Sequence, residues 1–256
     1  MTAVTTFRIY ASDRARTLEN IAQRPQIERE VDYYKENIGD IKSIDEFMDD
    51  YRLYSFAMKA HGLEDMTYAK AFMRKILEGG TGDDGFAHDL TDQRYGQFVE
   101  DFNFEQFEAA TTSFEAVTVG VVDKYYQQSI EVEAGEQSNG ARLALYFQRK
   151  AADIEETLSL LADPAFLQVT QIALGLPKTM SSAPIDNQVA MIEKRLDVED
   201  FKDPDFLDKF MQRFTILYDL NNPEVSATPS ILPIGNTFAA FSDDLLTSMQ
   251  NLRFNT

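Results

Sequence analysis

The sequence predicts an all-α protein: a duplicated helical module that forms a compact multi-helix bundle, followed by a C-terminal helical extension. The first observation is periodicity, because apolar residues recur at the three- and four-residue spacing of a helix face. The second is repetition, because a shift of 113 positions, which becomes 112 from Phe98 onward, aligns positions within residues 27–104 with positions within residues 140–220. Self-similarity at a fixed offset indicates two copies of one structural unit.

One helix carries the repeat most clearly. Before it stands an Asp that can accept hydrogen bonds from the free amides of a first turn, Asp50 in one copy and Asp163 in the other. After it comes a Gly-Leu pair that begins at Gly62 or Gly175. Because Gly readily takes the left-handed conformation that ends a helix, we expect a positive φ at both glycines. The matching apolar faces are Leu53, Phe56, Ala57 and Ala60 in the first copy and Phe166, Val169, Thr170 and Ala173 in the second.

Helix signals follow one another along the first copy. The Arg24-Pro25 pair interrupts one amphipathic stretch, and a second helix is expected to run to about Asn37. Ser43 and Glu46 have the spacing of a capping box, in which each satisfies an amide near the helix start. The expected elements are helices over 12–22 and 25–37, a helix from the capping box, the helix after Asp50, a helix over 66–78 and a glycine-rich loop over 79–85.

A long helix is expected to join the two copies. Thr112 and Glu115 also have capping-box spacing, which predicts a helix over 113–134 that ends at Gly135. Its β-branched start would suit a strand, but the polar residues continue at helical spacing and favour a helix. We therefore expect a first module over 1–110, a second module with the connecting helix over 111–222, and a proline-containing linker with a C-terminal helix over 223–256, or one compact unit that includes all three.

Composition excludes several classes of function. The net charge of −19 argues against nucleic acid, whose binding depends on Lys and Arg at phosphates, and against an anionic membrane surface. We assign this charge to solvated helix faces in preference to an acidic docking surface. No cysteine and no apolar run of membrane-spanning length occurs, and the N-terminal residues do not read as a cleaved secretory signal.

The sequence offers no catalytic, cofactor-binding or metal-binding residues. Its two histidines, His61 and His88, are isolated, and His61 stands where the second copy has Leu174, so a capping or surface role is expected. The loop over 79–85 lacks the Gly-Lys-Ser or Gly-Lys-Thr ending of a phosphate loop. The acidic loops do not keep the spacing of a calcium-binding EF-hand. We therefore predict no cofactor.

The segment after the repeat carries a second apolar helix. Three prolines lead into it and favour an extended path, and the helix is expected over 237–252. Its apolar face must be buried somewhere: against the chain's own core, which we favour because large exposed apolar patches are uncommon, or against a protein partner. If a partner binds, the candidate contact residues are Phe238, Phe241, Leu245 and Met249.

Several stretches resemble one protein family. They begin with Tyr33-Tyr34 and include Lys75–Glu78, Asp92–Tyr95 and Ala141–Phe147, and the likeness extends over about residues 7–220. The sequence is similar to alphaproteobacterial proteins that carry domain of unknown function 1217, many of which are encoded among flagellar genes. The resemblance defines no catalytic residues.

The resemblance implies a non-enzymatic structural or assembly protein, cytoplasmic or flagellum-associated, which acts through contacts with protein partners such as flagellar components. The alternative is a small-molecule-binding protein or an enzyme with a site between the two modules. A deep, closed pocket with converging carboxylates would favour this alternative.

Overall fold

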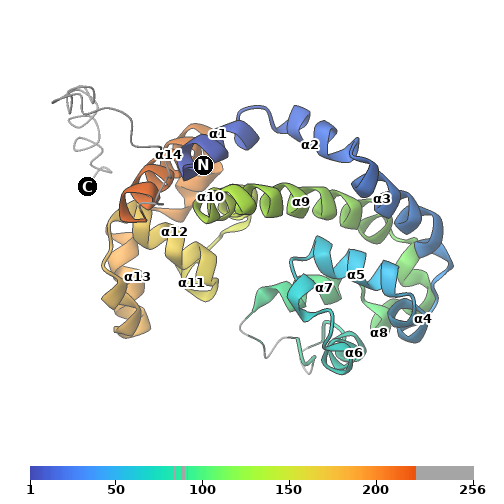
Figure 1. Cartoon of the computed structure of the whole chain (residues 1–256). Coiled ribbons are helices and arrows are strands. Elements are labelled where there is room, and N and C mark those ends of the chain that lie inside the picture. Colours follow the sequence, from blue (N-terminus) through green and yellow to red (C-terminus); the bar gives the residue numbers. More distant parts are fainter. Residues whose placement is uncertain (83–84, 88–89, 91, 223–256) are drawn as a thin grey trace.

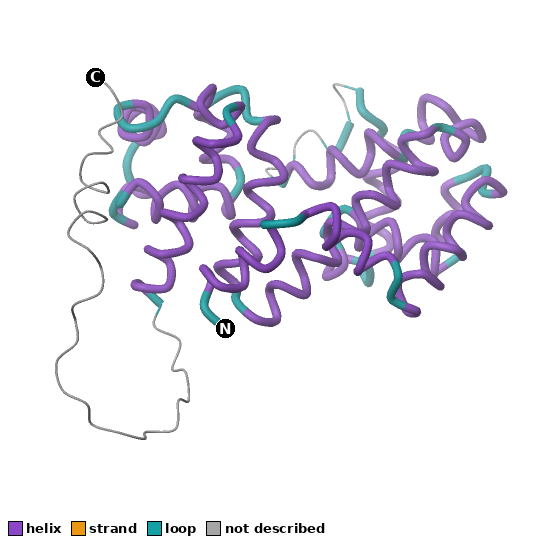
Figure 2. Tube along the Cα trace, turned by 90° about the horizontal axis from the view of Figure 1, so that it is seen from above, coloured by secondary structure: helices purple, strands orange, loops and turns teal. Residues whose placement is uncertain are grey.

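A long central helix, α9 (Val121–Gln137), links two groups of helices in this computed structural model (Figure 1). The structure describes residues 1–82, 85–87, 90 and 92–222. Helices cover 80% of these residues and none of them forms a strand, so the predicted all-α class is confirmed (Figure 2). Within the same residues no helix has the length and apolar character needed to cross a membrane. The predicted linker and C-terminal helix, with the four candidate contact residues, lie outside the described part of the chain.

The first module contains α-helices and short 3₁₀ turns. Its elements are α3 (Pro25–Asn37), η1 (Ile38–Asp40), α4 (Ile44–Asp49), α5 (Tyr51–Ala60), η2 (Glu64–Met66), α6 (Lys70–Gly79), α7 (Gln93–Asp101), α8 (Phe104–Phe107) and η3 (Glu108–Ser113). A short π-helical turn, η4 (Ala116–Gly120), then leads into α9.

The second module follows the same order of elements. These are α10 (Asn139–Lys150), η5 (Ala151–Asp153), α11 (Thr157–Ala162), α12 (Pro164–Leu174), η6 (Lys178–Ser182), α13 (Ile185–Glu193), η7 (Val198–Lys202) and α14 (Pro204–Asn221). From α10 to α13 they match α3 to α6 one for one, and α14 takes the place of α7 after the additional turn η7.

The helix ends confirm the predicted repeat in detail. Gly62 has φ of 70° and Gly175 has φ of 63°, as expected for residues that end a helix in the left-handed conformation. In both copies the following Leu donates its amide to a carbonyl of the last turn: Leu63 to Met58 and Leu176 to Gln171, each at 2.8 Å. One of the four carbonyls that each helix end leaves unpaired is satisfied in this way.

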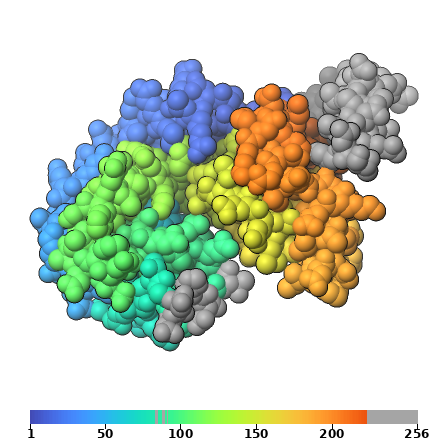
Figure 3. Space-filling view, turned by 180° about the vertical axis from the view of Figure 1, so that it is seen from behind, coloured from blue at the N-terminus to red at the C-terminus, as the bar shows by residue number. Residues whose placement is uncertain are grey.

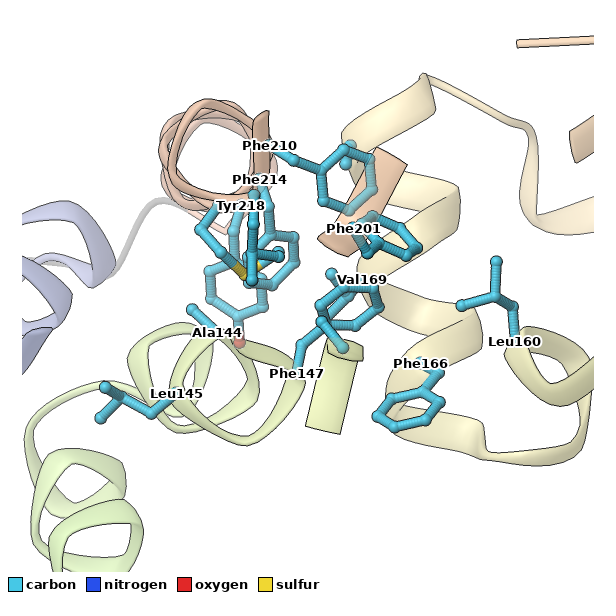
Figure 4. Close-up of a cluster of buried hydrophobic side chains, with 14 of the residues drawn as sticks. Ala144, Leu145, Phe147, Leu160, Phe166, Val169, Phe201, Phe210, Phe214 and Tyr218 are labelled. Atoms are coloured by element: carbon cyan, nitrogen blue, oxygen red, sulfur yellow. The ribbon is translucent and has the colours of Figure 1, made fainter. Parts of the chain in front are cut away.

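Each module has its own core. In the first, Phe47 stacks on Phe102 with ring centroids 4.7 Å apart. In the second, Phe147 contacts the rings of Phe201 and Phe210, with centroids 5.2 and 5.6 Å away (Figure 4). These residues come from α4, the end of α7, where Phe102 follows the last helical residue, and α10, η7 and α14, so aromatic packing in each copy ties early helices of the module to its last helix.

The N-terminal helices complete the second core. Helix α1 (Ala3–Ala11), which the sequence did not predict, and α2 (Arg14–Ala22) lie along α9 and α10 (Figure 1). Ala3 and Phe7 are buried in the second core, and the amides of Ala3 and Val4 donate to the Asp219 carboxylate at 2.7 and 3.1 Å. The expected first module over 1–110 therefore differs from the observed packing, because its first helix pairs with the end of the second module.

The connecting helix begins and ends later than expected. The Thr112 hydroxyl donates to the Ile41 carbonyl at 2.7 Å, so Thr112 does not cap a helix, and the predicted capping box is wrong. Residues 108–113 instead form η3, in which Thr112 is buried. Gly135 lies inside α9, where a Cβ would come within 3.0 Å of the Arg142 side chain, and Ser138 ends the helix with extended backbone.

Candidate functional site

A cleft lies between the two modules, with a volume of about 410 Å³. The space-filling view shows a hollow between the two groups of helices (Figure 3). Helix α9 forms its floor, the end of α5 and the start of α7 line it from the first module, and α10 and the α11–α12 junction line it from the second. We call it the intermodule cleft and define it by Ala60, His61, Gly62, Asp92, Arg94, Gln97, Lys124, Gln128, Glu131, Asn139, Arg142, Leu143, Tyr146, Arg149, Lys150, Ala162, Asp163, Pro164 and Ala165.

Helical spacing places the polar residues of the cleft. On α10 the lining residues recur at three- and four-residue intervals, so they share one face of the helix. The opposite face of α10 carries Ala144 and Phe147 into the second core. On α9 the residues Lys124, Gln128 and Glu131 share a face in the same way.

The cleft reverses the charge balance of the chain. The whole sequence has 43 acidic and 24 basic residues. The cleft, in contrast, is lined by five Lys and Arg side chains and only three carboxylates. A local excess of positive charge in an acidic protein attracts anions and excludes cations.

Three of the five cations are paired with carboxylates. Arg94 contacts Asp92 at 2.7 Å, and its other terminal nitrogen donates to the Gly62 carbonyl. Burial raises the pKa of Asp92, but hydrogen bonds from Arg94 outweigh this effect and leave the pKa below its usual range. Arg149 contacts the buried Glu131 at 2.5 Å. The third cation, Lys124, contacts Asp101, which stands behind the cleft wall.

The remaining two cations have no carboxylate partner among the described residues. Lys150 donates only to the side-chain oxygen of Gln97, at 3.2 Å. Burial lowers the pKa of Lys150, and the neighbouring positive charge of Arg149 lowers it further. The guanidinium of Arg142 is exposed and makes no hydrogen bond or ion pair with the described residues.

His61 is a buried cap and not a surface residue. It ends α5 as predicted, but its side chain is only 2% exposed. One ring nitrogen, Nδ1, lies 2.8 Å from the Ala57 carbonyl, and the other, Nε2, lies 2.8 Å from Asp101. Both nitrogens therefore face acceptors inside the protein, and neither is directed at the cleft. The sequence did not indicate Asp101 as a partner because it is 40 residues away.

Asp101 connects His61 to the cleft. Burial raises the pKa of Asp101, but the hydrogen bonds from His61 and Lys124 outweigh this effect and hold the pKa below its usual range. The charged carboxylate in turn fixes the position of Lys124 at the floor of the cleft. The side chains of His61, Asp101 and Lys124 therefore form a hydrogen-bonded group that supports the cleft wall.

Tyr146 forms part of the opposite wall. Its hydroxyl donates to Asp163 at 2.7 Å, and the same Asp caps α12 by accepting from the amides of Ala165 and Phe166. Burial, followed by the charge of Asp163, raises the pKa of Tyr146. The phenol is thus held as a neutral donor that fixes the α11–α12 junction against α10.

A second hollow lies between α11 and α13 and has the opposite character. Six carboxylates and no cation line it: Glu155, Glu156, Asp186, Glu193, Asp197 and Glu199. Its volume, about 700 Å³, exceeds that of the intermodule cleft. Nevertheless, no group of three or more possible metal ligands with suitable geometry is found among the described residues. We take the cleft as the candidate site because side chains of both modules converge there.

The sequence alone predicts no residue of the cleft as a site residue. One signal was present, since Arg142, Arg149 and Lys150 form a basic stripe on one helix face of an acidic chain. Gln97, the hydrogen-bond partner of Lys150, comes from the other module, and only the fold brings it near. The cleft also differs from the deep, closed pocket with converging carboxylates that would have favoured a small-molecule-binding protein or an enzyme.

Comparison with known proteins gives a family and one solved structure. The family described as protein of unknown function (DUF1217) matches residues 60–207. The chain is similar to the crystal structure of protein AGR_C_984 from Agrobacterium tumefaciens, with 45% identity and a TM-score of 0.78. The alignment covers 86% of this chain and 94% of that chain. No curated protein matches the sequence.

Proposed function

This chain belongs to the DUF1217 family of proteins of unknown function, and from that premise we propose a non-enzymatic binding protein whose working site is the intermodule cleft. The observation that carries this proposal is the convergence of five basic side chains from both modules in a chain of net charge −19. Clefts between structural units that contain a few converging polar groups are the usual places of ligand binding.

The hydrogen bonding of the ionisable groups supports binding over catalysis. A general base needs a free acceptor within reach of a substrate proton. Here the His61 ring faces Ala57 and Asp101, and the carboxylates of Asp92 and Glu131 are bonded to Arg94 and Arg149. These pairs hold the walls of the cleft in place.

We further propose that the partner is a flagellar component, recognised through protein–protein contacts. The support is the likeness to a family with many members encoded among flagellar genes. Phe238, Phe241, Leu245 and Met249 remain our predicted additional contacts in the segment outside the described residues.

Affinity purification from native cells tests the proposal, with flagellar subunits scored in the captured material. The decisive variant is Ala165→Trp, which fills the cleft from the first turn of α12, where Ala165 is half-buried. The matched control is Ala110→Trp, at an exposed position in η3 away from the cleft. We expect the first variant to lose the partner and to impair motility, and the control to retain both. If the Ala165→Trp protein is folded and captures the same partners as the wild type, the cleft is not the working site.

A further inference from the structure

We propose that the intermodule cleft binds a small ligand bearing phosphate or carboxylate groups, with Lys150 and Arg142 as the residues that receive its negative charge. This inference rests on the proposed function, because it takes the cleft as a binding site, and it adds the chemical class of the ligand. The shared chemistry is the oxyanion, which Arg binds through its planar fork and Lys binds as a point charge.

The five cations of the cleft differ in whether they form ion pairs. Arg94, Arg149 and Lys124 each have a carboxylate at ion-pair distance, whereas Lys150 and Arg142 have none among the described residues. In a chain with 43 acidic residues, carboxylate partners are abundant. Two unpaired cations in one cleft are therefore available to an external anion.

The surroundings of Lys150 also favour a bound anion. Burial and the positive charges of Arg149 and Lys124 lower the pKa of its ammonium, and the charges of Asp153 and Glu131, which raise this pKa, do not offset them. A folded protein gains no stability from such crowding of like charges. An anion bound between these groups would relieve the repulsion, and groups with perturbed pKa values in a cleft are typical of functional sites.

The shape of the cleft suits a small ligand. Arg142 and Lys150 lie eight residues apart on one face of α10, about 12 Å along the helix axis at 1.5 Å per residue. Leu143 and Tyr146 lie between them and face the same cleft. The volume of about 410 Å³ falls in the range of small-molecule sites. The wall thus offers cationic ends and a less polar middle.

Thermal melting and isothermal calorimetry of the purified protein test the inference, with inorganic phosphate and citrate as separate probes. Sodium chloride at matched ionic strength controls for screening. We expect one or both probes to raise the melting temperature saturably. Phosphate alone would indicate a phosphate-bearing ligand, and citrate alone a carboxylate-bearing one.

Three variants separate the cleft from the general surface. Lys150→Met and Arg142→Gln each should weaken binding of the active probe at least tenfold. Lys209→Met, at an exposed lysine of α14, should leave binding unchanged. Circular dichroism establishes that each variant is folded. A melting temperature that neither probe raises, or an equal rise with chloride, overturns the inference. So does binding that persists in both cleft variants.

This failure is distinguishable from failure of the proposed function. If neither anion binds but Ala165→Trp abolishes partner capture, the cleft is a protein-binding site and the inferred ligand class is wrong. If an anion binds through Lys150 and Arg142 but Ala165→Trp captures every partner, the inference stands and the proposed partner site is wrong.

Discussion

The two modules contain the same tyrosine–aspartate pair in different surroundings. The Tyr33 hydroxyl donates to Asp50 and the Tyr146 hydroxyl donates to Asp163, both at 2.7 Å. In the first module the exposed Arg52 lies over the Tyr33 ring, 3.8 Å from its centroid. Burial is the main cause that raises the pKa of Tyr146, whereas the hydrogen bond to Asp50 is the main cause for Tyr33.

The arrangement of the modules explains this difference. The end of α5 and the start of α7 in the first module face α10 and the start of α12 in the second. The two modules therefore contribute different, non-equivalent parts of the repeated unit to the cleft. The equivalent face of the first module carries Tyr33 and Asp50, and neither of these residues lines the cleft. A duplicated element therefore becomes part of a site only where the other copy covers it.

The largest expected effect comes from giving the second module a residue of the first. Gly140 aligns with Ile27, and a Cβ at Gly140 would lie 2.4 Å from the Tyr218 ring and 2.8 Å from the Ala3 side chain. Because α10 packs this closely on α14 and α1, Gly140→Ile should lower the free energy of unfolding by more than about 3 kcal/mol. Denaturant titration measures this loss.

The reverse exchange, Ile27→Gly, is the control. It removes a half-buried side chain and adds a helical glycine, so it should cost about 2 kcal/mol. If Gly140→Ile is as stable as the wild type, the two copies pack alike at this position and the comparison fails.

The next largest loss of stability is expected from replacing the equivalent aspartates of the two modules, Asp50 and Asp163. Asp50→Ala and Asp163→Ala both remove a helix cap, at about 1 kcal/mol each. Asp163→Ala also leaves the more buried phenol of Tyr146 without its acceptor, which adds about 1–2 kcal/mol. We therefore expect Asp163→Ala to be the more destabilising variant in urea unfolding. Combination with Tyr146→Phe should recover part of the loss, and equal losses at the two sites would refute the assigned difference in environment.

The glycines that end α5 and α12 test the repeat itself. Gly62→Val and Gly175→Val force a β-branched residue into a positive-φ conformation, and each should lower stability by about 2 kcal/mol. The effect should be slightly larger at Gly62, where a Cβ would approach the Gln128 side chain at 3.5 Å, while nothing lies within 4 Å of the Cβ at Gly175. Melting of either variant at the wild-type temperature would contradict the requirement for glycine.

The smallest expected effect is a gain in stability, from replacing Lys150. Because burial lowers the pKa of Lys150 in the folded protein, the unfolded chain holds this proton more tightly, and the charged side chain opposes folding at neutral pH. Lys150→Met should therefore stabilise the protein by about 1 kcal/mol or less, after allowance for solvent screening. The gain should shrink as the pH rises from the folded pKa towards the unfolded value of about 10.4. Melting at pH 7 and at pH 10 measures it, and a loss of stability at pH 7 would contradict the assignment.

The sequence predicted local structure better than it predicted the site. Caps such as Asp50 and Asp163 and the terminal glycines act on residues nearby in the chain, so their patterns are readable without a fold. The partner of His61 is 40 residues away, and Arg94 reaches a carbonyl 32 residues away, so only tertiary packing identifies these contacts. The capping-box pattern failed at Thr112. The pattern predicts that the Thr112 hydroxyl accepts from a helix amide, but in the structure this hydroxyl donates to the carbonyl of Ile41, which is distant in the sequence.

The attachment of α1 to α14 also orders events during synthesis. The amides of Ala3 and Val4 bind Asp219, which lies 216 and 215 positions further along the chain. The core of the first module needs no residue beyond Tyr125 among its buried members, so we expect that module to fold while the second is still being made. Helix α1 leaves the ribosome early, but its binding place, formed by α9, α10 and α14, is complete only after α14 has emerged. The contact between α1 and α14 therefore forms only at the end of translation, and closing a loop of this length makes that contact a late step of folding.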